Sequence, residues 1–423
     1  DAPAFIFCWG MGITQHLHSV ATIQMLQNVL LARGNFGRPG AGACPVRGHS
    51  NVQGDRTMGI WEKPPAALLD RLQSVYGFDV PRENGYDVVE SIAAMRDGKA
   101  SVFFAMGGNF AAATPDTVET WKALRKCALT VHVSTKLNRS HVIHGREALI
   151  LPCLGRTEMD MQATGSQGVT VEDSMSMVHL SSGINPPASP QLLSEPVIVA
   201  RLAHATLAGR TRVDWLWLVE DYARVRDEIE RVFDDFKDFN ARVAKPGGFR
   251  LYNGPSERVW KTASGKASFK VHAVPRDTPI HKARARVKDA IVFTLQTTRS
   301  HDQYNTTIYG HDDRYRGVFG QRRVLFINRE DIRALGFKDG DWVDLATVWD
   351  DGQDRRANRF RLVAYDIPRG NVAAYYPETN PLVPLSSVAL NAGTPTSKSI
   401  PVVLLPHRVA DEALLPEEAE AVA

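Results

Sequence analysis

The sequence predicts an α/β protein with Rossmann-like parallel sheets, followed by a C-terminal β-rich domain that we expect to be a barrel. Apolar strands and amphipathic helices alternate over residues 87–151, which is the pattern of a parallel sheet with crossover helices. After "DAIVFTLQTTRSHDQYN" (residues 289–305) short strands with turns replace the helices, as in all-β barrels. A passage rich in proline, glycine and lysine, residues 245–289, separates the two patterns and contains the expected linker.

The composition is that of a globular protein with several domains. The 423 residues are 43% hydrophobic and 23% charged, with a net charge of +3, and this length is enough for two to four domains with buried cores. Because acidic and basic residues are interspersed, neither a nucleic-acid nor a membrane-surface partner is expected. No apolar run approaches the roughly 20 residues of a membrane span, and we expect a cytoplasmic protein.

The four cysteines predict ordinary reduced thiols. Cys8, Cys44, Cys127 and Cys153 lie far apart, and no CxxC pair occurs. This spacing argues against a disulfide framework, and against a zinc or iron–sulfur site built from this segment alone.

The first elements are an apolar strand at residues 4–8, the turn Gly10-Met11-Gly12, and a helix with apolar positions from Val20 to Leu30 that ends at Gly34. A domain rarely opens directly on a buried strand, and the sequence has neither an initiator methionine nor a signal peptide. We therefore expect the chain to be the C-terminal part of a longer protein.

The alternating region places polar turns after its strands. Its expected elements are a helix at 87–97, a strand at 102–106, a helix at 115–126, a strand at 128–133, a weaker helix at 136–144 and a strand at 148–151. Thr114 is the expected N-cap of the second helix, with Pro115 at its first position. Ligands bind at the carboxyl ends of parallel strands, where Gly107-Gly108-Asn109 and Ser134-Thr135-Lys136 stand.

The remaining elements are expected in two groups. Before the linker these are strands and turns over 155–190 and helices at 190–208 and 219–239; after it they are strands at 325–327, 342–349, 359–364 and 372–375.

The stretch "GAGACPVRGHSNVQGDRTMGI" (residues 40–60) is rich in glycine and carries an arginine, Arg47, near its centre. Glycines allow a backbone to approach a ligand closely and to offer N–H groups to an anion. The guanidinium of Arg47 keeps its charge and presents a planar pair of donors that matches a carboxylate or a phosphate. The alternative is a structural loop whose arginine pairs with a carboxylate such as Asp55.

Two further motifs are compatible with ligand binding. In "LQTTRSHDQYNTT" (residues 295–307), Arg299, His301, Gln303 and Asn305 follow an apolar strand and would grip a phosphorylated ligand; the alternative is a solvated loop. His301 is expected as a hydrogen-bond donor, because no second histidine stands at metal-ligand spacing. In "NAGTPTSKS" (residues 391–399), the default interpretation of Lys398 is a surface lysine.

Several common catalytic motifs do not occur. The sequence contains no GxSxG, GxxxxGK[ST] or HExxH motif, and Gly10-Met11-Gly12 lacks the third glycine and the distant acidic residue of a dinucleotide fingerprint.

Three segments together resemble one enzyme family. "GMGITQ" (10–15), "GNFGRPGAG" (34–42) and "PVRGHSNVQG" (45–54) are similar to the mid-chain segment of the molybdenum and tungsten bis-molybdopterin-guanine-dinucleotide (bis-MGD) oxidoreductases of the DMSO-reductase superfamily. More narrowly, they resemble the formate dehydrogenase alpha subunits and their relatives. The C-terminal domain resembles the family's molybdopterin dinucleotide-binding domain, a double-psi β-barrel, and the whole chain can be laid on the family's second half.

The resemblance implies a domain organisation. Residues 1–49 would end one α/β cofactor-binding domain, 50–285 would form a second α/β domain with 155–190 as a β insertion toward an absent N-terminal domain, 286–410 would form the barrel, and 411–423 a tail. The family's [4Fe–4S] cysteines and the cysteine or selenocysteine that ligates its metal belong to the first half, so no metal ligand is expected in this segment.

The resemblance also implies site residues. Arg47 would hold the substrate anion, a carboxylate in formate dehydrogenases, and His49 would lie near the pterin and the substrate. The implied cofactor-binding residues are Gly10, Gly12, Thr14, Gln15, Gly108, Asn109, Thr135, Lys136, Thr298, Arg299, His301, Tyr304, Asn380 and Lys398.

The implied function is oxidation of formate to CO₂ by a bis-MGD cofactor with Mo or W, with electrons passed to an iron–sulfur cluster and then to an electron-acceptor protein or subunit. The chain departs from the close formate dehydrogenases at "LGRTEMDMQATGSQGVTVEDSMSMVH" (154–179), where they carry "GE…G"; this places it in the formate-dehydrogenase-like branch. The alternatives are the same scaffold acting on an oxo-anion or N-oxide, and a cofactor-binding or electron-transfer subunit without turnover.

Overall fold

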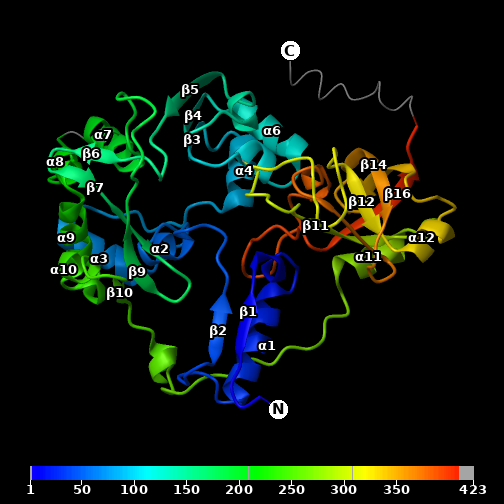
Figure 1. Ribbon diagram of the computed structural model, residues 1–423, viewed down its shortest axis with the longest axis horizontal. Coiled ribbons are helices and arrows are strands. Elements are labelled where there is room, and N and C mark those ends of the chain that lie inside the picture. The colour runs from blue at the N-terminus through cyan, green and yellow to red at the C-terminus, as the bar shows by residue number, and fades with distance from the viewer. Residues whose placement is uncertain (1, 208, 307, 409–423) are drawn as a thin grey trace.

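The computed structural model describes residues 2–207, 209–306 and 308–408, so the expected tail at 411–423 lies outside the described residues. Figure 1 shows the β3–β5 sheet at the top, a helical region at the left, the barrel at the right, and the β1–β2 pair with α1 below the centre. The parallel α/β sheets and the C-terminal barrel confirm the expected fold class. The domain boundaries stay predictions.

The N-terminal unit is a pair of parallel strands with one helix. β1 (Ile6–Trp9) pairs with β2 (Gly42–Pro45), and between them lie the 3₁₀ turn η1 (Met11–Thr14) and α1 (Ser19–Ala32). The chain leaves α1 through Gly34, whose φ of +60° is left-handed and favours glycine. After β2 comes the loop that carries Arg47, and then α2 (Val52–Thr57).

A second parallel sheet has the order β3-β4-β5. Its strands are β3 (Val102–Met106), β4 (Leu129–Ser134) and β5 (Glu147–Pro152), close to the expected positions. The helices α4 (Val88–Arg96) and α6 (Thr117–Lys126) cover one face with a core that includes Ile92, Met95, Leu124 and Phe103. α4 starts with a capping box, in which the side chain of Asp87 accepts hydrogen bonds from the first turn.

The expected N-cap at Thr114 is wrong. A short helix, α5 (Phe110–Ala113), comes first, and the hydroxyl of Thr114 donates back to the Phe110 carbonyl at 2.8 Å. α6 begins only at Thr117, after Asp116 in a left-handed conformation with φ of 49°. The Asp116 carboxylate binds Arg355 of the barrel instead of the helix terminus, so a distant contact overrides the local capping signal.

Two other helices differ from expectation. The expected helix at 136–144 is only the 3₁₀ turn η2 (Arg139–His141). The expected helix at 219–239 is split at Asp221, which ends one helix and caps the next by accepting a hydrogen bond from Ala223 N. Both differences arise because polar side chains near a turn satisfy backbone N–H groups locally.

The region at the left of Figure 1 combines small antiparallel sheets with helices. Its strands are β6 (Asp160–Gln162), β7 (Gly165–Gln167), β8 (Val169–Glu172), β9 (Met177–Ser181) and β10 (Phe249–Arg250). Its helices are α3 (Ala66–Tyr76), α7 (Glu195–Leu207), α8 (Trp215–Glu220), α9 (Tyr222–Val232), η3 (Asp234–Phe236) and α10 (Phe239–Val243).

The linker crosses the molecule beside α1. After η4 (Gly254–Glu257) it runs along the bottom of Figure 1 to α11 (Pro279–Arg286). Lys270 in the linker pairs with the side-chain amide of Asn28 on α1, donating its N–H to Oδ1 at 3.1 Å and accepting from Nδ2 at 2.5 Å.

The C-terminal domain is a closed six-stranded barrel in the order β11-β15-β12-β14-β13-β16. The strands are β11 (Phe293–Thr298), β12 (Val324–Ile327), β13 (Trp342–Thr347), β14 (Arg356–Ala364), β15 (Asn371–Tyr375) and β16 (Ile400–Pro406); α12 (Arg329–Ala334) and η5 (Asn380–Leu382) connect them. Phe293, Leu345 and Phe360 are fully buried inside it. Across the described ranges, no helix combines the length and apolar character needed to cross a membrane.

Candidate cofactor and substrate site

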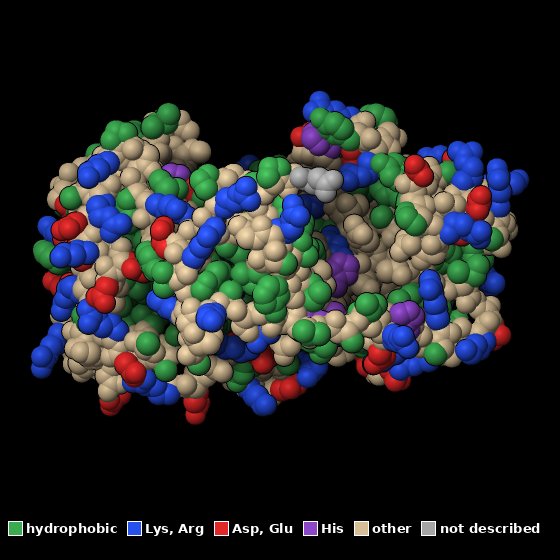
Figure 2. Space-filling model, turned by 90° about the horizontal axis from the view of Figure 1, so that it is seen from below, with side chains coloured by type: hydrophobic (Ala, Val, Ile, Leu, Met, Phe, Trp, Pro, Cys, Tyr) green, Lys and Arg blue, Asp and Glu red, His purple; other side chains and the backbone are tan. Residues whose placement is uncertain are grey.

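Loops from the N-terminal unit, the β3–β5 sheet and the barrel meet in one region. Seen from below, Figure 2 shows a hollow right of the centre in which histidine side chains lie beside lysine and arginine side chains. The contacts described next connect Arg47, the turn at Gly12, the strand end at Asn109 and the barrel residues Tyr304 and Lys398. Segments that carry many of the implied residues therefore contact one another, whereas the binding roles of these residues stay predictions.

The loop after β2 is held from both sides. A Cβ atom at Gly48 would lie 2.9 Å from the sulfur of Met11, so glycine is what lets the loop rest against the η1 turn. On the other side the His49 ring meets the Tyr304 ring of the barrel edge-on, with 6.2 Å between centroids. Arg47 directly precedes these two contacts in the chain, and its side chain is exposed.

The Arg47 guanidinium has no ion pair or hydrogen bond within the part of the chain that the structure describes. The alternative interpretation, a structural pairing with Asp55, is therefore not realised among these residues. An arginine that is fixed at its backbone and keeps its donors available can bind an anion.

Lys398 is not a surface lysine, and that default interpretation was wrong. Its Nζ donates to the carbonyl and the hydroxyl of Thr297, and its backbone N–H donates to the Gln15 carbonyl at 3.2 Å. A Cβ at Gly12 would lie 3.7 Å from Lys398 Cε. Burial, and then the charge of Arg299, lower the pKa of Lys398 to about 8. The lysine thus joins the barrel to the Gly12 turn.

A histidine that sequence reasoning missed completes this basic cluster. The pKa of His16 is lowered by burial and then by the charge of Lys398. His16, Arg299 and Lys398 therefore converge, and no carboxylate contributes to the pKa shift of either His16 or Lys398. A bound anion would oppose these shifts, because it favours the protonated forms of His16 and Lys398. The only signal in the sequence was that His16 directly follows Gln15.

The end of β3 is a glycine turn open to a ligand. Gly107 and Gly108 have φ values of 69° and 74°, and a Cβ on either would meet nothing within 4 Å. Asn138 donates to the Gly108 carbonyl at 2.8 Å, and buried Asn109 donates to the Thr306 carbonyl of the barrel at 3.2 Å. The hydrogen bond from Asn138 thus holds the glycine turn in place, and the one from Asn109 connects it to the barrel.

The other candidate residues differ in their solvent exposure and in their hydrogen bonds. Thr135 and Lys136 lie exposed at the end of β4, and the Lys136 carbonyl accepts from Ser134 Oγ at 2.7 Å. The hydroxyl of Thr14 donates to the Met11 carbonyl at 2.7 Å, whereas Gly10 has open space around it. Thr135 and Lys136 are therefore accessible to a ligand, whereas the hydroxyl of Thr14 is used within its own turn.

The side chains of two candidate residues, Asn380 and His301, are held by contacts with other residues of the chain. The side chain of Asn380 is buried and donates to the Ala112 carbonyl at 2.6 Å, so it joins the barrel to the β3–β5 region. His301 packs on Tyr315 with 4.0 Å between ring centroids, and its Nε2 lies 3.0 Å from Asp302 Oδ1.

The loop after β11 carries an exposed arginine, Arg299. The exposed guanidinium of Arg299 lies over the Tyr376 ring at 6.0 Å, and the hydroxyl of its neighbour Thr298 is 3.5 Å from the Arg299 carbonyl. The buried Arg322 donates to Glu378 at 2.6 Å and to Ser300 at 2.7 Å, which anchors the base of this loop.

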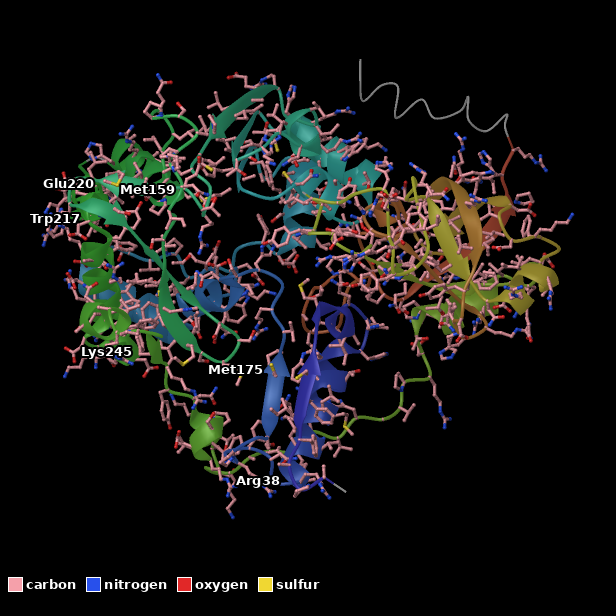
Figure 3. All side chains as sticks on the ribbon, in the orientation of Figure 1. Arg38, Met159, Met175, Trp217, Glu220 and Lys245 are labelled. Atoms are coloured by element: carbon pink, nitrogen blue, oxygen red, sulfur yellow. The ribbon has the colours of Figure 1, made fainter. Side chains whose placement is uncertain are left out.

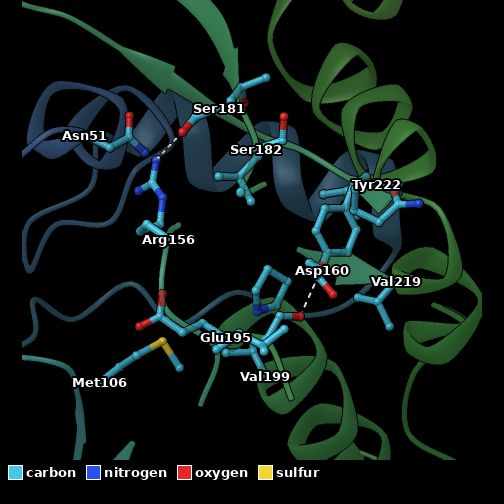
Figure 4. Close-up of a pocket in the computed structure, with 18 of the residues that line it drawn as sticks. Asn51, Met106, Arg156, Asp160, Ser181, Ser182, Glu195, Val199, Val219 and Tyr222 are labelled. Atoms are coloured by element: carbon cyan, nitrogen blue, oxygen red, sulfur yellow. Dashed lines mark hydrogen bonds between the residues drawn. The ribbon is translucent and has the colours of Figure 1, made fainter. Parts of the chain in front are cut away.

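A cavity of about 680 Å³ begins at His49 and extends into the helical region. Figure 4 shows Arg156 with Ser181 on one side and Tyr222 with Asp160 on the other, with their side chains around a shared space. Arg156 donates to Ser181 Oγ at 3.1 Å, and the Tyr222 hydroxyl donates to Asp160. Sequence reasoning missed this cavity, because its lining comes from segments far apart in the chain.

The lining of the cavity carries more negative than positive charge. Its carboxylates are Asp55, Glu158, Asp160 and Glu195, and its one arginine is Arg156. Glu158 accepts hydrogen bonds from the N–H groups of Gly155 and Ala188, both at 2.6 Å, which lower the pKa of its carboxyl.

Two buried histidines lie under the β3 turn. The rings of His132 on β4 and His141 are 5.1 Å apart, and the Nε2 atom of each is buried without a partner in the described structure. Burial, followed by the charges of His141 and His144, lowers the pKa of His132 to about 4. His141 Nδ1 accepts from the N–H of Asn138, the residue that supports Gly108. No three His, Cys, Asp or Glu side chains in the described ranges gather as metal ligands.

Comparison with known proteins identifies the family. Residues 2–144 match the model of the molybdopterin oxidoreductases, and residues 293–402 match that of the molybdopterin dinucleotide binding domain. The chain belongs to the molybdopterin oxidoreductases.

Relatives of this molybdopterin oxidoreductase cover nearly the whole chain. It is 55% identical over 406 residues to an uncharacterized oxidoreductase of Mycobacterium tuberculosis, which covers 95% of this chain and 51% of the relative. It is 48% identical over 407 residues to protein YdeP of Escherichia coli, with 96% and 53% covered. The chain thus spans about half the length of these curated relatives.

Two further proteins are similar over less of the chain or at lower sequence identity. YrhE of Bacillus subtilis, whose name assigns it provisionally to the formate dehydrogenases, is 35% identical over 119 residues, 26% of this chain and 12% of YrhE. Among solved structures, acetylene hydratase from Pelobacter acetylenicus has a TM-score of 0.50 and 14% identity, with 81% of this chain and 50% of that chain covered. The latter similarity concerns the fold alone.

The residues of the hollow fit a molybdopterin dinucleotide. A dinucleotide carries phosphates, which Arg299 and Lys398 can bind by charge-assisted hydrogen bonds, with His16 close to Lys398. The open turn at Gly107 and Gly108 stands at the carboxyl end of a parallel strand, where nucleotides bind in such sheets.

Proposed function

We propose that this molybdopterin oxidoreductase is formate dehydrogenase-like and oxidises formate to CO₂, a proton and two electrons. The cofactor would be bis-MGD with Mo or W, bound between the barrel and the α/β sheets. Electrons would pass to a [4Fe–4S] cluster outside this chain and then to an electron-acceptor protein or subunit in the cytoplasm. The partial identity to YrhE supports this choice of reaction.

The proposal rests on the contacts of Arg47 and its loop. Its loop is fixed between Met11 and the Tyr304 ring, whereas its guanidinium has no ion pair among the described residues. Formate offers two carboxylate oxygens, which match the paired donors of a guanidinium. A fixed backbone with an available planar cation is what orienting a small carboxylate requires.

Arg47 would act through position and charge. It keeps its proton throughout, so it binds the carboxylate and stabilises negative charge without carrying a proton itself. His49, the next side chain on the loop after Gly48, would lie beside the bound anion. The cofactor, when bound, supplies the redox chemistry.

The cavity beside His49 favours a second candidate, in which the same scaffold acts on another small substrate. Four carboxylates and one arginine line this cavity. Such a lining repels anions and admits neutral molecules more readily. If the substrate enters this way, a neutral compound such as an N-oxide suits the lining better than an anion.

The test is kinetic and uses two substitutions in the full-length enzyme. Arg47→Lys keeps the charge but loses the planar pair of donors, and one charge-assisted hydrogen bond contributes about 1.5–3 kcal/mol. We expect kcat/KM for formate to fall by roughly one to two powers of ten. Arg47→Ala should lower it further, and both variants should retain metal, pterin and melting temperature.

Arg38→Lys is the matched control on the same glycine loop. Arg38 donates to the Pro3 carbonyl at 2.6 Å, and Figure 3 places it at the foot of the β1–β2 unit, away from the barrel. The control should leave kcat/KM unchanged. Unchanged kcat/KM in Arg47→Lys, or a lower melting temperature without a kinetic defect in Arg47→Ala, would contradict the proposed role. A wild-type enzyme that loads cofactor but turns over an N-oxide instead of formate would favour the second candidate.

A further inference from the structure

A second cavity, of about 780 Å³, lies among α3, α8 and α9, which are labelled at the left of Figure 1. Its remaining wall is the segment between α7 and α8. Most of the side chains that line it are apolar, and they include Leu68, Leu72, Phe78, Leu207, Val225 and Ile229. Protein interiors are close-packed, whereas apolar cavities of roughly 300–1,000 Å³ with a few polar groups are typical of small-molecule sites. The cavity therefore has the size and the lining of a ligand site.

This cavity is distinct from the one that begins at His49. The two cavities share one partition, because Trp215, Leu218 and Val225 line both of them. His49 lines the first cavity alone. A molecule bound in the second cavity would therefore contact the partition and not His49.

The charged side chains of the lining are Arg210, Arg212 and Glu228. Glu228 is already paired within the fold: its carboxylate accepts from Arg231 at 2.7 Å and from the hydroxyl of Tyr76 at 2.9 Å. The negative charge of the lining is thus neutralised by a neighbour on α9.

The two arginines, by contrast, keep their charges available. Both are exposed, and neither forms an ion pair with a carboxylate among the residues that the structure describes. Arg210 donates to the carbonyl of Thr206 at 3.2 Å. Guanidinium groups without an acidic partner can bind a carboxylate through charge-assisted hydrogen bonds.

Helix ends oppose this attraction in part. The helices α3, α7 and α9 end at Tyr76, Leu207 and Val232, which all line the cavity. The carboxyl end of a helix acts as about half a negative charge, so three ends amount to roughly one and a half. The arginines supply two full positive charges, and the lining therefore stays positive on balance.

We propose that this cavity binds a small amphipathic carboxylic acid, with its apolar body between α3 and α9 and its carboxylate at Arg210 and Arg212. Burial of the apolar body supplies most of the affinity. The two guanidinium groups select a negatively charged head over a neutral or a positive one. The inference depends neither on the proposed oxidation of formate nor on a bound cofactor.

The first experiment titrates decanoate into the full-length protein by calorimetry, with decanol and decylammonium as tails of the same length and different charge. Decanoate should bind at least tenfold more tightly than decanol, because a charge-assisted hydrogen bond contributes that much. Decylammonium should bind most weakly. Equal or tighter binding of decanol or decylammonium would overturn the proposal. Absence of decanoate binding would overturn it as well, because the cavity would then be closed in the full-length protein.

A substitution inside the cavity shows where decanoate binds. Leu72→Trp fills the cavity from α3 and should weaken decanoate binding at least tenfold, without lowering the melting temperature, because the larger ring occupies existing space. Leu202→Trp is the control, since Leu202 on α7 is 44% exposed and lines neither cavity. Unchanged affinity in Leu72→Trp would place decanoate elsewhere and overturn the proposal.

A second substitution isolates the contribution of the head group. Arg212→Gln should weaken decanoate binding about tenfold and leave decanol binding unchanged, because only the carboxylate loses a charged partner. Arg125→Gln, an exposed arginine of α6 outside the cavity, is the control and should change neither affinity. Equal losses for decanoate and decanol in Arg212→Gln, or no loss for either, would contradict the proposed head-group site. This result is independent of whether Leu72→Trp folds.

Discussion

The barrel and the two parallel sheets bury their apolar side chains in different ways. The barrel closes on itself through the pairing of β11 with β16, and Phe293 and Phe360 are fully buried inside it. The β3–β5 sheet relies on helices instead: α4 and α6 pack on one face, and Ile198 of α7 clusters with Val133 on the other, where Phe104 stays partly exposed. Closure thus buries the barrel's apolar side chains among its own strands, whereas the open sheet is covered by elements outside it. The candidate cofactor site lies where these two kinds of structure meet.

A buried ion pair fixes the two regions to each other. Arg355 of the barrel donates to Asp116, which precedes α6, at 2.8 Å, and also to Asp351 at 2.7 Å. The side chains of Arg355 and Asp116 are only 6% and 4% exposed. Asp116 also accepts from the N–H of Leu385, at 3.2 Å. This ion pair, together with the hydrogen bond from Asn109 to Thr306, joins the β3–β5 region to the barrel.

The largest effect is expected from breaking this ion pair. Arg355→Leu leaves the Asp116 carboxylate buried without its partner, and removing one partner of a buried pair costs about 3–5 kcal/mol. We expect this loss in the free energy of unfolding from urea titration. The neighbouring substitution Arg356→Leu is the control, since Arg356 pairs with Asp354 at the surface and such pairs contribute about 0–1 kcal/mol. Equal losses in the two variants would show that the ion pair does not hold the regions together.

A smaller loss of stability, which originates in the β3–β5 sheet, is expected at acidic pH. His132 is neutral in the fold because its pKa is about 4, whereas an unfolded histidine takes up a proton near pH 6.5. Stability should therefore fall as the pH drops from about 6.5 to 4, by roughly 3 kcal/mol in total. His132→Gln should remove this part of the pH dependence, and substitution of the exposed His311 should not. Parallel pH profiles for His132→Gln and the wild type would contradict the assignment.

The sequence predicted an element correctly where residues next to each other in the chain determine it. The strand expected at 102–106 is β3, because its apolar residues lie between clear turn residues. The cap expected at Thr114 failed, because Asp116 is drawn to Arg355, a partner from the barrel that no local pattern reveals.

The candidate site was predictable only in part. The glycine loop around Arg47 stood out because its composition is unusual within one short segment. The basic cluster did not, since His16 and Lys398 come from opposite ends of the chain and meet only in the fold. The burial of Lys398 was hidden for the same reason: Thr297 and Gln15, which contact it, are distant in the sequence.

We infer that the barrel and the sheets together form one anion-binding cofactor cleft, and Lys398→Met in the full-length protein is the substitution that tests this inference. Burial and Arg299 disfavour the charged lysine in this fold, so methionine should leave the melting temperature of the cofactor-free protein unchanged or higher. Loss of a charge-assisted hydrogen bond should weaken cofactor binding by about 1.5–3 kcal/mol, or roughly tenfold to a hundredfold.

The measurement is the content of molybdopterin guanine dinucleotide per protein, with Lys338→Met, in an exposed turn beside Gly340, as the control. We expect Lys398→Met to purify with much less cofactor and to melt no earlier than the wild type when both are free of cofactor, and we expect the control to match the wild type. A lower melting temperature with full cofactor content would show instead that Lys398 is a structural hydrogen-bond donor to Thr297, and would contradict the account.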